Sequence, residues 1–330
     1  MTIHGQTTRD RRPVLVTGAA GFIGHHTAGL LLDWGFPVIG IDSFTPYYAR
    51  STKERNLSAL LERDGFRFTE TFIDSPGTEQ YLSDVQAVVH LAAQPGVRDS
   101  WAEFDTYVQL NIHATKWLLD AALRHGSPRV VSASSSSVYG EAPVYPTCEG
   151  AQTTPRSPYG ITKLAAERLC VAYGLERGLP TVGLRFFTVF GPAQRPDMAI
   201  QRLITAAHEG TTFELFGDGR QIRDFTFVGD VARATALAAI TELPPGSVFN
   251  VCSETPITVN DVIEVVEAVS GQTVQLERHS VSVGDVTRTG GSADMIADAL
   301  GWRAETSLED GIRAQVAEHR RRMSLAGLAA

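Results

Sequence analysis

A tyrosine and a lysine four residues apart are the side chains in this sequence best placed to do chemistry. Tyr159 and Lys163 lie in the run Ser157 to Lys163, where Pro158 suits the first turn of a helix. At this spacing both side chains lie one turn apart on the same helical face. An ammonium beside a phenol lowers the pKa of the phenol from about 10 towards the range of a general base. The pair can therefore take a proton from a substrate hydroxyl.

A glycine-rich turn near the N-terminus indicates a dinucleotide site. Gly18, Gly21 and Gly24 directly follow the first apolar run and open a helix. Gly18 allows a tight turn, Gly21 lets the backbone approach a pyrophosphate, and Gly24 lets the helix pack closely on the strand. We expect the cofactor to contact this turn at Gly18, Gly21, Phe22, Ile23 and Gly24.

Asp42 ends the second apolar run, eighteen residues after Gly24. A carboxylate there can accept both hydroxyls of an adenosine ribose. A 2'-phosphate would need a neighbouring arginine, and Ser43 and Phe44 provide none. The pattern predicts NAD rather than NADP, the alternative being an aspartate that caps a turn.

The elements that must position these residues follow an alternating pattern from Pro13 to about Phe187. Short runs rich in Val, Ile, Leu, Phe and Ala alternate with segments of helical period, which predicts crossover units and a doubly wound parallel Rossmann sheet, an α/β fold. The expected strands are Val14–Val16, Val38–Ile41, Phe66–Phe72, Ala87–Leu91, Arg129–Ser134 and Thr181–Phe186. The expected helices between them are Gly21–Leu32, Trp101–Arg124 and Tyr159–Leu175.

After Gly191 the pattern loosens into shorter helices and strands. We expect residues 1–12 to form a disordered tail, residues 13–190 an NAD-binding Rossmann domain that includes the Tyr159 helix, and residues 191–330 mainly a smaller α+β substrate-binding domain. No Ser/Gly/Pro linker separates the two parts. A ligand should therefore lie in a cleft between them.

Composition excludes several classes of protein. The 330 residues carry a formal net charge of -8, which gives no basic field for nucleic acid, and no run of about eighteen apolar residues offers a membrane span. The three cysteines, Cys148, Cys170 and Cys252, are odd in number and far apart, which fits neither a disulfide framework nor a metal site. We expect a cytoplasmic protein without a metal.

Taken together, the motifs resemble the extended short-chain dehydrogenase/reductases, and within them the NAD-dependent nucleotide-sugar epimerases and dehydratases. The resemblance covers Val14 to about Ile312. Its markers are the glycine turn, His90 to Gln94, Ser134 to Gly140, Tyr159-x-x-x-Lys163, Leu184 to Pro192 and Arg223 to Thr226.

The resemblance implies a tightly held NAD+ and assigns roles to several residues. Tyr159 would be the acid/base, Lys163 would bind the nicotinamide ribose, and Ser135 would hydrogen-bond the reacting sugar hydroxyl. Leu91, Ala92, Ala93 and Asn111 would line the cofactor pocket. It also implies a homodimer, formed through the helices Trp101–Arg124 and Tyr159–Leu175.

The serine cluster limits which of the family's reactions this chain is expected to catalyse. Family members that eliminate water carry an Asp-Glu pair where this chain has Ser136 and Ser137, and the decarboxylating enzymes that make UDP-xylose carry a glutamate in the cluster. Both reactions are disfavoured. The chain looks most like the UDP-glucuronate 4-epimerases, which are isomerases that act through a 4-keto intermediate.

In that subgroup, small hydroxyls hold the C5 carboxylate, and two arginines are candidates for the diphosphate. Hydroxyl donors bind a carboxylate without adding a fixed charge at the reacting centre. The residues that correspond in this chain are Ser135, Ser136, Ser137 and Thr188 for the sugar, Arg195 and Arg223 for the diphosphate, and Asp285 near the uridine.

Other functions are compatible with the same residues. The same fold could epimerise UDP-glucose or UDP-N-acetylglucosamine, and a requirement for the C6 carboxylate would distinguish these. Decarboxylation of UDP-glucuronate or dehydration of a nucleotide sugar is a weaker alternative. A regulatory protein that senses NAD without chemistry is the alternative from another class, and the intact tyrosine and lysine argue against it.

Overall fold

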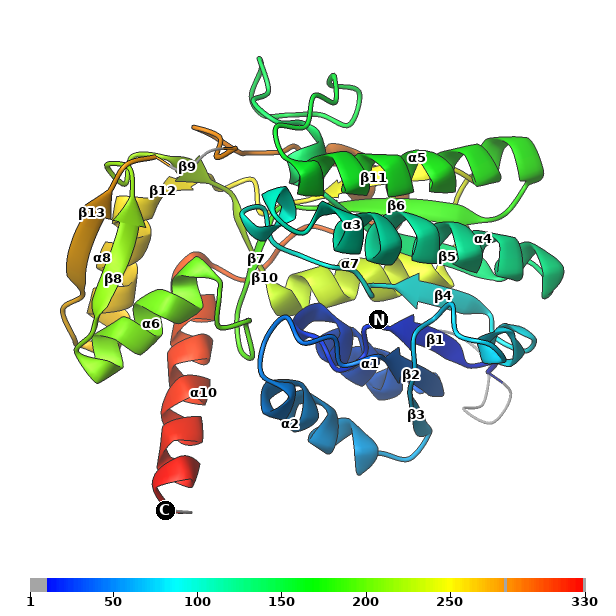
Figure 1. Ribbon diagram of the computed structural model, residues 1–330, viewed down its shortest axis with the longest axis horizontal. Coiled ribbons are helices and arrows are strands. Elements are labelled where there is room, and N and C mark those ends of the chain that lie inside the picture. The colour runs from blue at the N-terminus through cyan, green and yellow to red at the C-terminus, as the bar shows by residue number, and fades with distance from the viewer. Residues whose placement is uncertain (1–10, 282–283, 329–330) are drawn as a thin grey trace.

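The fold is built on a seven-stranded parallel sheet. The computed structural model describes residues 11–281 and 284–328, so most of the expected N-terminal tail lies outside the described residues. The sheet runs in the order β11-β6-β5-β4-β1-β2-β3 (Figure 1), which confirms the doubly wound parallel sheet. Its strands are β1 (Val14–Thr17), β2 (Val38–Asp42), β3 (Phe66–Glu70), β4 (Ala87–His90), β5 (Arg129–Ser135), β6 (Thr181–Phe186) and β11 (Ser247–Val251).

Helices cover both faces of the sheet because its central strands are apolar on both sides. All residues of β1, β4 and β6 are buried. One face carries α1 (Phe22–Asp33), α2 (Arg50–Leu61) and α7 (Val228–Ile240), and the other carries α4 (Ala114–Arg124) and α5 (Pro158–Arg177) (Figure 1). The strand order reverses between β1 and β4, which is where such sheets have their ligand crevice.

Helix α5, which carries Tyr159 and Lys163, has a well-defined start. The side chain of Ser157 caps it by accepting a hydrogen bond from the backbone N–H of Gly160 at 3.1 Å, and Pro158 occupies the first helical position. The helix ends at Gly178 in the left-handed conformation. These caps fix Tyr159 in the first turn of the helix.

The helix expected from Trp101 to Arg124 is interrupted. Trp101 lies in a short 3-10 turn, α3 spans Phe104–Tyr107, and a π-helical segment, Val108–His113, precedes α4. The wider π turn accommodates Asn111 in the interior, where its side chain is buried. In place of the expected single helix, the chain forms α3, the π-helical segment and α4 in succession, and Trp101 lies in a separate turn before them.

The smaller part of the fold packs α6 (Ala199–Glu209), α8 (Val259–Ser270) and α10 (Leu308–Leu328) around a separate apolar core. Short strand pairs surround it: β8 (Thr212–Phe216) with β13 (Gln275–His279), β7 (Thr188–Phe190) with β10 (Phe225–Phe227), and β9 (Ile222–Arg223) with β12 (Ile257–Thr258). The division expected at Gly191 does not hold throughout. Strand β11 pairs with β6, and α7 and α9 (Asp294–Leu300) pack in the sheet layer.

Two kinds of feature are absent from the described residues. No helix within residues 11–281 and 284–328 is both long and apolar enough to cross a membrane. In the same part of the chain, no three or more His, Cys, Asp or Glu side chains are grouped so that they could hold a metal ion.

A buried ion pair joins α5 to the two strands beneath it. Arg185 on β6 donates from Nε and Nη2 to the two carboxylate oxygens of Glu167 on α5, at 2.8 and 2.7 Å, and both side chains are almost fully buried. Ser134 on β5 donates to the same carboxylate at 2.7 Å, and the remaining nitrogen of Arg185 donates to the hydroxyl of Tyr139 at 2.7 Å. The helix and the strands that carry the site are thus joined by one polar network.

Replacing Arg185 by methionine should destabilise the fold strongly, because it leaves the Glu167 carboxylate buried without its partner. We expect the free energy of unfolding to fall by about 3–5 kcal/mol, measured by urea titration with circular dichroism. Arg313→Met is the matched control, since it breaks an exposed ion pair with Glu309 and should change this free energy by less than about 1 kcal/mol. Equal effects in the two variants would contradict a structural role for the buried pair.

Candidate active site

Two adjoining cavities lie where the strands end. The larger, of about 480 Å³, is lined by the carboxyl ends of β1, β2, β4 and β5, by α1 and α5, and by residues 186–199. The smaller, of about 250 Å³, extends towards residues 284–289. Val97, Ser136, Ser137 and Thr188 line both cavities, so the two form one continuous site at the crevice of the sheet.

The glycine turn has the geometry that the sequence predicted. Gly18 has a φ of +71°, and a Cβ on it would lie 2.9 Å from the backbone nitrogen of Ala92. A Cβ on Gly24 would overlap the carbonyl oxygen of Gly18, so only glycine lets α1 pack against the turn. The N-terminus of α1 has no side-chain cap and faces the larger cavity through Gly21, Phe22, Ile23 and Gly24. Free backbone N–H groups in such a cradle suit a pyrophosphate.

Asp42 lines the same cavity and also holds the turn that follows β2. Its two carboxylate oxygens accept hydrogen bonds from the backbone N–H groups of Ala20 (3.1 Å) and Phe44 (2.8 Å). Both readings of this residue, ribose contact and turn cap, are therefore compatible with its position.

Lys53 is a residue that the sequence argument missed. Its ammonium lies 3.8 Å from a carboxylate oxygen of Asp42, donates to the carbonyl oxygen of Thr45 at 3.1 Å, and lines the cavity. Burial lowers the pKa of Lys53, while Asp42 raises it. Lys53 lies eleven residues after Asp42, beyond the two neighbouring positions on which the preference for NAD rests. Its signal in the sequence was a lysine on the same helical face as Leu57 and Leu60, which are buried.

Tyr159, Lys163 and Ser135 come together as expected, but their electrostatics differ from the expectation. The ammonium of Lys163 donates to the carbonyl oxygen of Ala133 at 2.9 Å, and burial lowers the pKa of Lys163 to about 8. Burial also raises the pKa of Tyr159, and a hydrogen bond with Ser135 and the charge of Arg195 lower it. The expected lowering of the Tyr159 pKa is therefore wrong, because loss of hydration outweighs the nearby charges.

The serine cluster and Thr188 stand where the two cavities meet. Ser135 accepts a hydrogen bond from the backbone N–H of Ser137 at 3.1 Å and so closes the turn after β5. Ser136, Ser137 and Thr188 line both cavities, close to Tyr159 in the larger one. The junction thus offers several neutral hydroxyl groups beside the tyrosine.

The two arginines expected at a diphosphate lie in different cavities. Arg195 lines the larger one, where Asp197 accepts two hydrogen bonds from it at 3.0 and 2.9 Å, and its charge acts on Tyr159. Arg223 lines the smaller one and forms an ion pair of 2.6 Å with Asp285. Arg195 is therefore placed nearer to the reacting group, and Arg223 with Asp285 nearer to the far end of a bound ligand.

Asn111 is not among the residues that line the two cavities, although Leu110 beside it lines the larger one. Its amide oxygen accepts from the backbone N–H of Gln94 at 2.7 Å, and its amide nitrogen donates to Gln94 and to Thr162 Oγ1 at 3.1 and 3.0 Å. The side chain fastens the loop after β4 to helix α5. Leu91, Ala92 and Ala93 from that loop do line the larger cavity.

Known proteins that are similar in sequence to this chain are described as nucleotide-sugar epimerases. The family model described as "NAD dependent epimerase/dehydratase family" matches residues 14–252. A UDP-glucuronate 4-epimerase of Thermodesulfobacterium geofontis (strain OPF15) is 36% identical over 307 residues, which cover 92% of this chain and 94% of the relative. A protein of Bacillus subtilis (strain 168), named as the uncharacterized UDP-glucose epimerase YtcB, is 39% identical over 308 residues, or 92% and 96% of the two chains.

A solved structure is similar over nearly its whole length. The crystal structure of UDP-glucuronic acid 4-epimerase from Bacillus cereus, in complex with UDP-glucuronic acid and NAD, matches with a TM-score of 0.90 and 37% sequence identity. The match covers 94% of this chain and 99% of that chain.

The buried Lys163 should make stability depend on pH. Its pKa of about 8 in the folded protein lies below the ordinary value of 10.5, so its protonation opposes folding fully below about pH 8, and this opposition is lost as the pH rises towards 10.5. Relative to Lys163→Met, the wild type should gain about 1–2 kcal/mol of unfolding free energy between about pH 7.5 and about pH 9.5. Lys116→Met, at an exposed lysine paired with Asp120, is the control and should show no such gain. Parallel pH profiles for wild type and Lys163→Met would contradict the prediction.

Proposed function

The chain belongs to the NAD dependent epimerase/dehydratase family, as its motifs predicted, and on that premise we propose that it inverts C4 of a UDP-sugar. The proposed substrate is UDP-glucuronate and the product UDP-galacturonate. The observation that carries the proposal is one continuous site in which Tyr159, Lys163 and Ser135 adjoin the neutral hydroxyl groups of Ser136, Ser137 and Thr188.

The residues around the larger cavity suit NAD. The turn requires glycine at positions 18 and 24, because a Cβ at either would collide with backbone, and the uncapped N-terminus of α1 can bind a pyrophosphate. Asp42 would hold the ribose, and Leu91, Ala92, Ala93, Tyr159 and Lys163 would line the rest of the cofactor site. When bound, NAD+ accepts the hydride from C4 of the sugar and returns it, and its positive charge favours the phenolate of Tyr159.

Tyr159 then acts as base and acid in turn. Its phenolate takes the proton of the C4 hydroxyl, and the neighbouring Ser135 hydroxyl holds that oxygen by a hydrogen bond. After the 4-keto sugar has turned over within the site, Tyr159 gives the proton back to the C4 oxygen on the opposite face. Proton and hydride are both restored to the sugar, so no net oxidation occurs. The ammonium of Lys163 would bind the nicotinamide ribose.

The hydroxyl groups at the junction suit a carboxylate. Ser136, Ser137 and Thr188 can donate to the C5 carboxylate of a glucuronate, while Arg195 supplies a positive charge that Asp197 partly offsets. A 4-keto glucuronate is a β-keto acid, and it loses CO2 when the bond to its carboxylate aligns with the carbonyl π system. Hydrogen bonds from several sides restrain that bond, so the cluster should also suppress decarboxylation.

The proposed assembly is a homodimer. Apolar side chains are exposed on α5 and beside α3, with exposed fractions of 50% for Ile161, 68% for Leu175, 54% for Trp101 and 41% for Phe104. Such a surface suits a symmetric interface.

We place the enzyme in the cytoplasm, because all three cysteines are free thiols.

Tyr159→Phe should abolish turnover, because it removes the only atom of this side chain that exchanges a proton. We expect conversion of UDP-glucuronate to fall by about a thousandfold or more, followed by NMR of the anomeric and H4 protons, with NAD still bound. Tyr81→Phe, which loses a hydrogen bond to Thr69 outside the site, is the control and should keep its activity. Substantial turnover by Tyr159→Phe would refute the assignment.

Thr188→Val should change selectivity between substrates. Losing one hydrogen bond to a charged carboxylate should lower kcat/KM for UDP-glucuronate about ten- to a hundredfold, with little effect on any conversion of UDP-glucose. The control is Thr235→Val, a buried threonine in α7 that bonds only its own helix. If UDP-glucose is instead the better substrate of the wild type, the hydroxyl cluster does not select a carboxylate and the enzyme is a neutral-sugar 4-epimerase.

A further inference from the structure

The loop of residues 191–198 joins β7 to α6 and carries Arg195, which lines the larger cavity. Its backbone is unusual at two positions: Gly191 has a φ of +136°, and Ala193 has a φ of +63° although it is not a glycine. A non-glycine residue in the left-handed region is strained and persists only where the surrounding structure holds it. The contacts that hold this loop therefore bear on where Arg195 lies.

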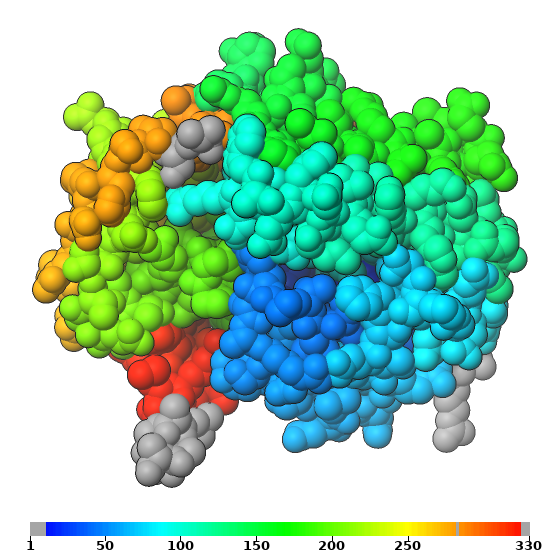
Figure 2. Space-filling model, viewed as in Figure 1, coloured from blue at the N-terminus to red at the C-terminus, as the bar shows by residue number. Residues whose placement is uncertain are grey.

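Helix α10 supplies these contacts, although Gln315 on α10 follows Gly191 by 124 residues. Gly311 and Gln315 lie one turn apart on the same face of α10. A Cβ on Gly311 would lie 2.5 Å from the buried ring of Phe190 on β7, so a larger residue would push the helix away from the strand. In the space-filling view, the red surface of α10 lies against the green surface around α6 (Figure 2). This close approach puts Gln315 within reach of the loop.

The side-chain amide of Gln315 is fully buried and bonds at both ends. Its oxygen accepts a hydrogen bond from the backbone N–H of Gly191 at 3.0 Å. Its nitrogen donates to the side-chain oxygens of Gln194 at 2.9 Å and Gln201 at 3.1 Å, which uses both of its hydrogens. Gln315 therefore binds the start of the loop, the residue before Arg195 and the first turn of α6 at once.

Gln194, which is also buried, carries this connection to the active site. Its amide oxygen also accepts from the backbone N–H of Gln201 at 2.9 Å, and its amide nitrogen donates to the carbonyl oxygen of Val189 at 3.0 Å. Val189 directly follows Thr188, and Arg195 directly follows Gln194. The buried amide of Gln194 thus fixes the backbone next to both of these site residues.

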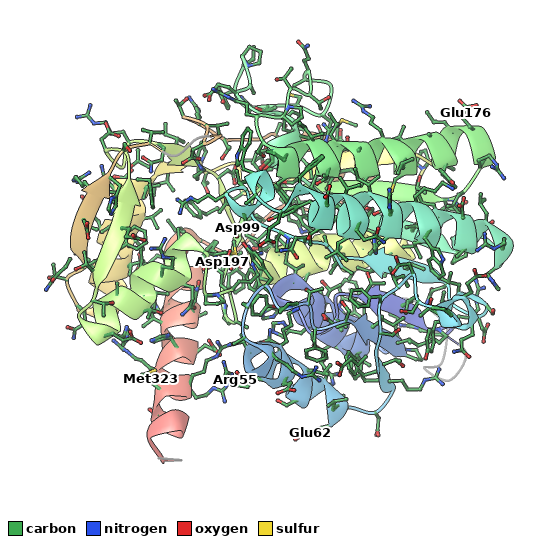
Figure 3. The ribbon with its side chains drawn as sticks, in the orientation of Figure 1. Arg55, Glu62, Asp99, Glu176, Asp197 and Met323 are labelled. Carbon is green, nitrogen blue, oxygen red and sulfur yellow. The ribbon has the colours of Figure 1, made fainter. Side chains whose placement is uncertain are left out.

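Arg195 depends on this backbone for its position. Its ion pair is with Asp197, which belongs to the same loop, so the pair moves with the loop and does not anchor it. The guanidinium of Arg195 lies 5.8 Å from the centre of the Tyr47 ring, on the other side of the cavity. Figure 3 shows Asp197 where the two parts of the molecule meet, and Met323 towards the far end of α10. The place of the guanidinium in the cavity is therefore set by the loop that Gln315 holds.

We propose that Gln315, acting through Gln194, is a positioning residue for Arg195, and that it holds residues 191–198 in the conformation that presents the guanidinium to the diphosphate of the substrate. This inference rests on the proposed function, since it places a UDP-sugar in the site. Gln315 is not among the residues that line the two cavities, so its effect on the ligand passes through the loop. The diphosphate does not react, so a misplaced Arg195 weakens substrate binding more than it slows the chemical steps.

The test separates KM from kcat. Gln315→Met keeps the size of the side chain and removes its three hydrogen bonds. We expect KM for UDP-glucuronate to rise about tenfold, the lower end of what losing a hydrogen bond to a charged group costs, with kcat within about twofold of wild type. Arg195→Met should also raise KM. Adding Gln315→Met to Arg195→Met should raise it no further, because Gln315 acts through Arg195.

Two more variants separate positioning from stability. Gln194→Met breaks the same connection from the side of the loop and should raise KM in the same way, which keeps the test decisive where Gln315→Met folds poorly. The control is Val316→Ala, which shortens an apolar side chain of α10 in the separate core. It should lower the free energy of unfolding and leave KM at the wild-type value. A purely structural role for Gln315 would reduce the amount of active enzyme, and with it kcat, at an unchanged KM.

The outcomes separate this positioning role from the proposed function. A wild-type KM in Gln315→Met and Gln194→Met would overturn the positioning role and leave the proposed epimerase intact. A further rise in KM when Gln315→Met is added to Arg195→Met, or an equal rise in Val316→Ala, would overturn it as well. Failure of the wild type to convert any UDP-sugar would overturn the proposed function and the positioning role with it.

Discussion

The buried ion pair between Arg185 and Glu167 is the constraint on which the site depends. Glu167 lies one turn after Lys163 on α5, and its carboxylate also binds Ser134, the residue before the serine cluster. Arg185 lies on β6, just before the strand that carries Thr188. A buried charge is tolerated only with its partner in place. The helix of Tyr159 and Lys163, the serine cluster and Thr188 are therefore held in one relative arrangement.

Burial sets the chemistry of the groups so arranged. It raises the pKa of Tyr159 and lowers that of Lys163. The hydrogen bond with Ser135 and the charge of Arg195 act on the pKa of Tyr159 in the opposite direction. The lysine opposes folding, as expected when a group is held for function rather than for stability.

The features that could be predicted from the sequence are those set by residues close together in the chain. Glycines at 18, 21 and 24 and the start of α5 at Pro158 depend on neighbouring residues, and the structure has them as expected. The contacts of Asn111 with Gln94 and Thr162 join segments far apart in the chain, and no local pattern predicts them. Lys53 had a local signal, its position on the buried face of α2. Strand β11, which lies beyond the division expected at Gly191, returns to the sheet by pairing with β6, a long-range contact that no local pattern predicts.

The most direct test of the account follows one atom. UDP-glucuronate carrying deuterium at C4 is incubated with the purified protein, with no NAD added, and the product is analysed by mass spectrometry and NMR. The account predicts UDP-galacturonate that keeps the deuterium at C4, because the hydride returns to C4 and the proton returns to the C4 oxygen. Loss of the label to water, or a pentose product, would contradict it.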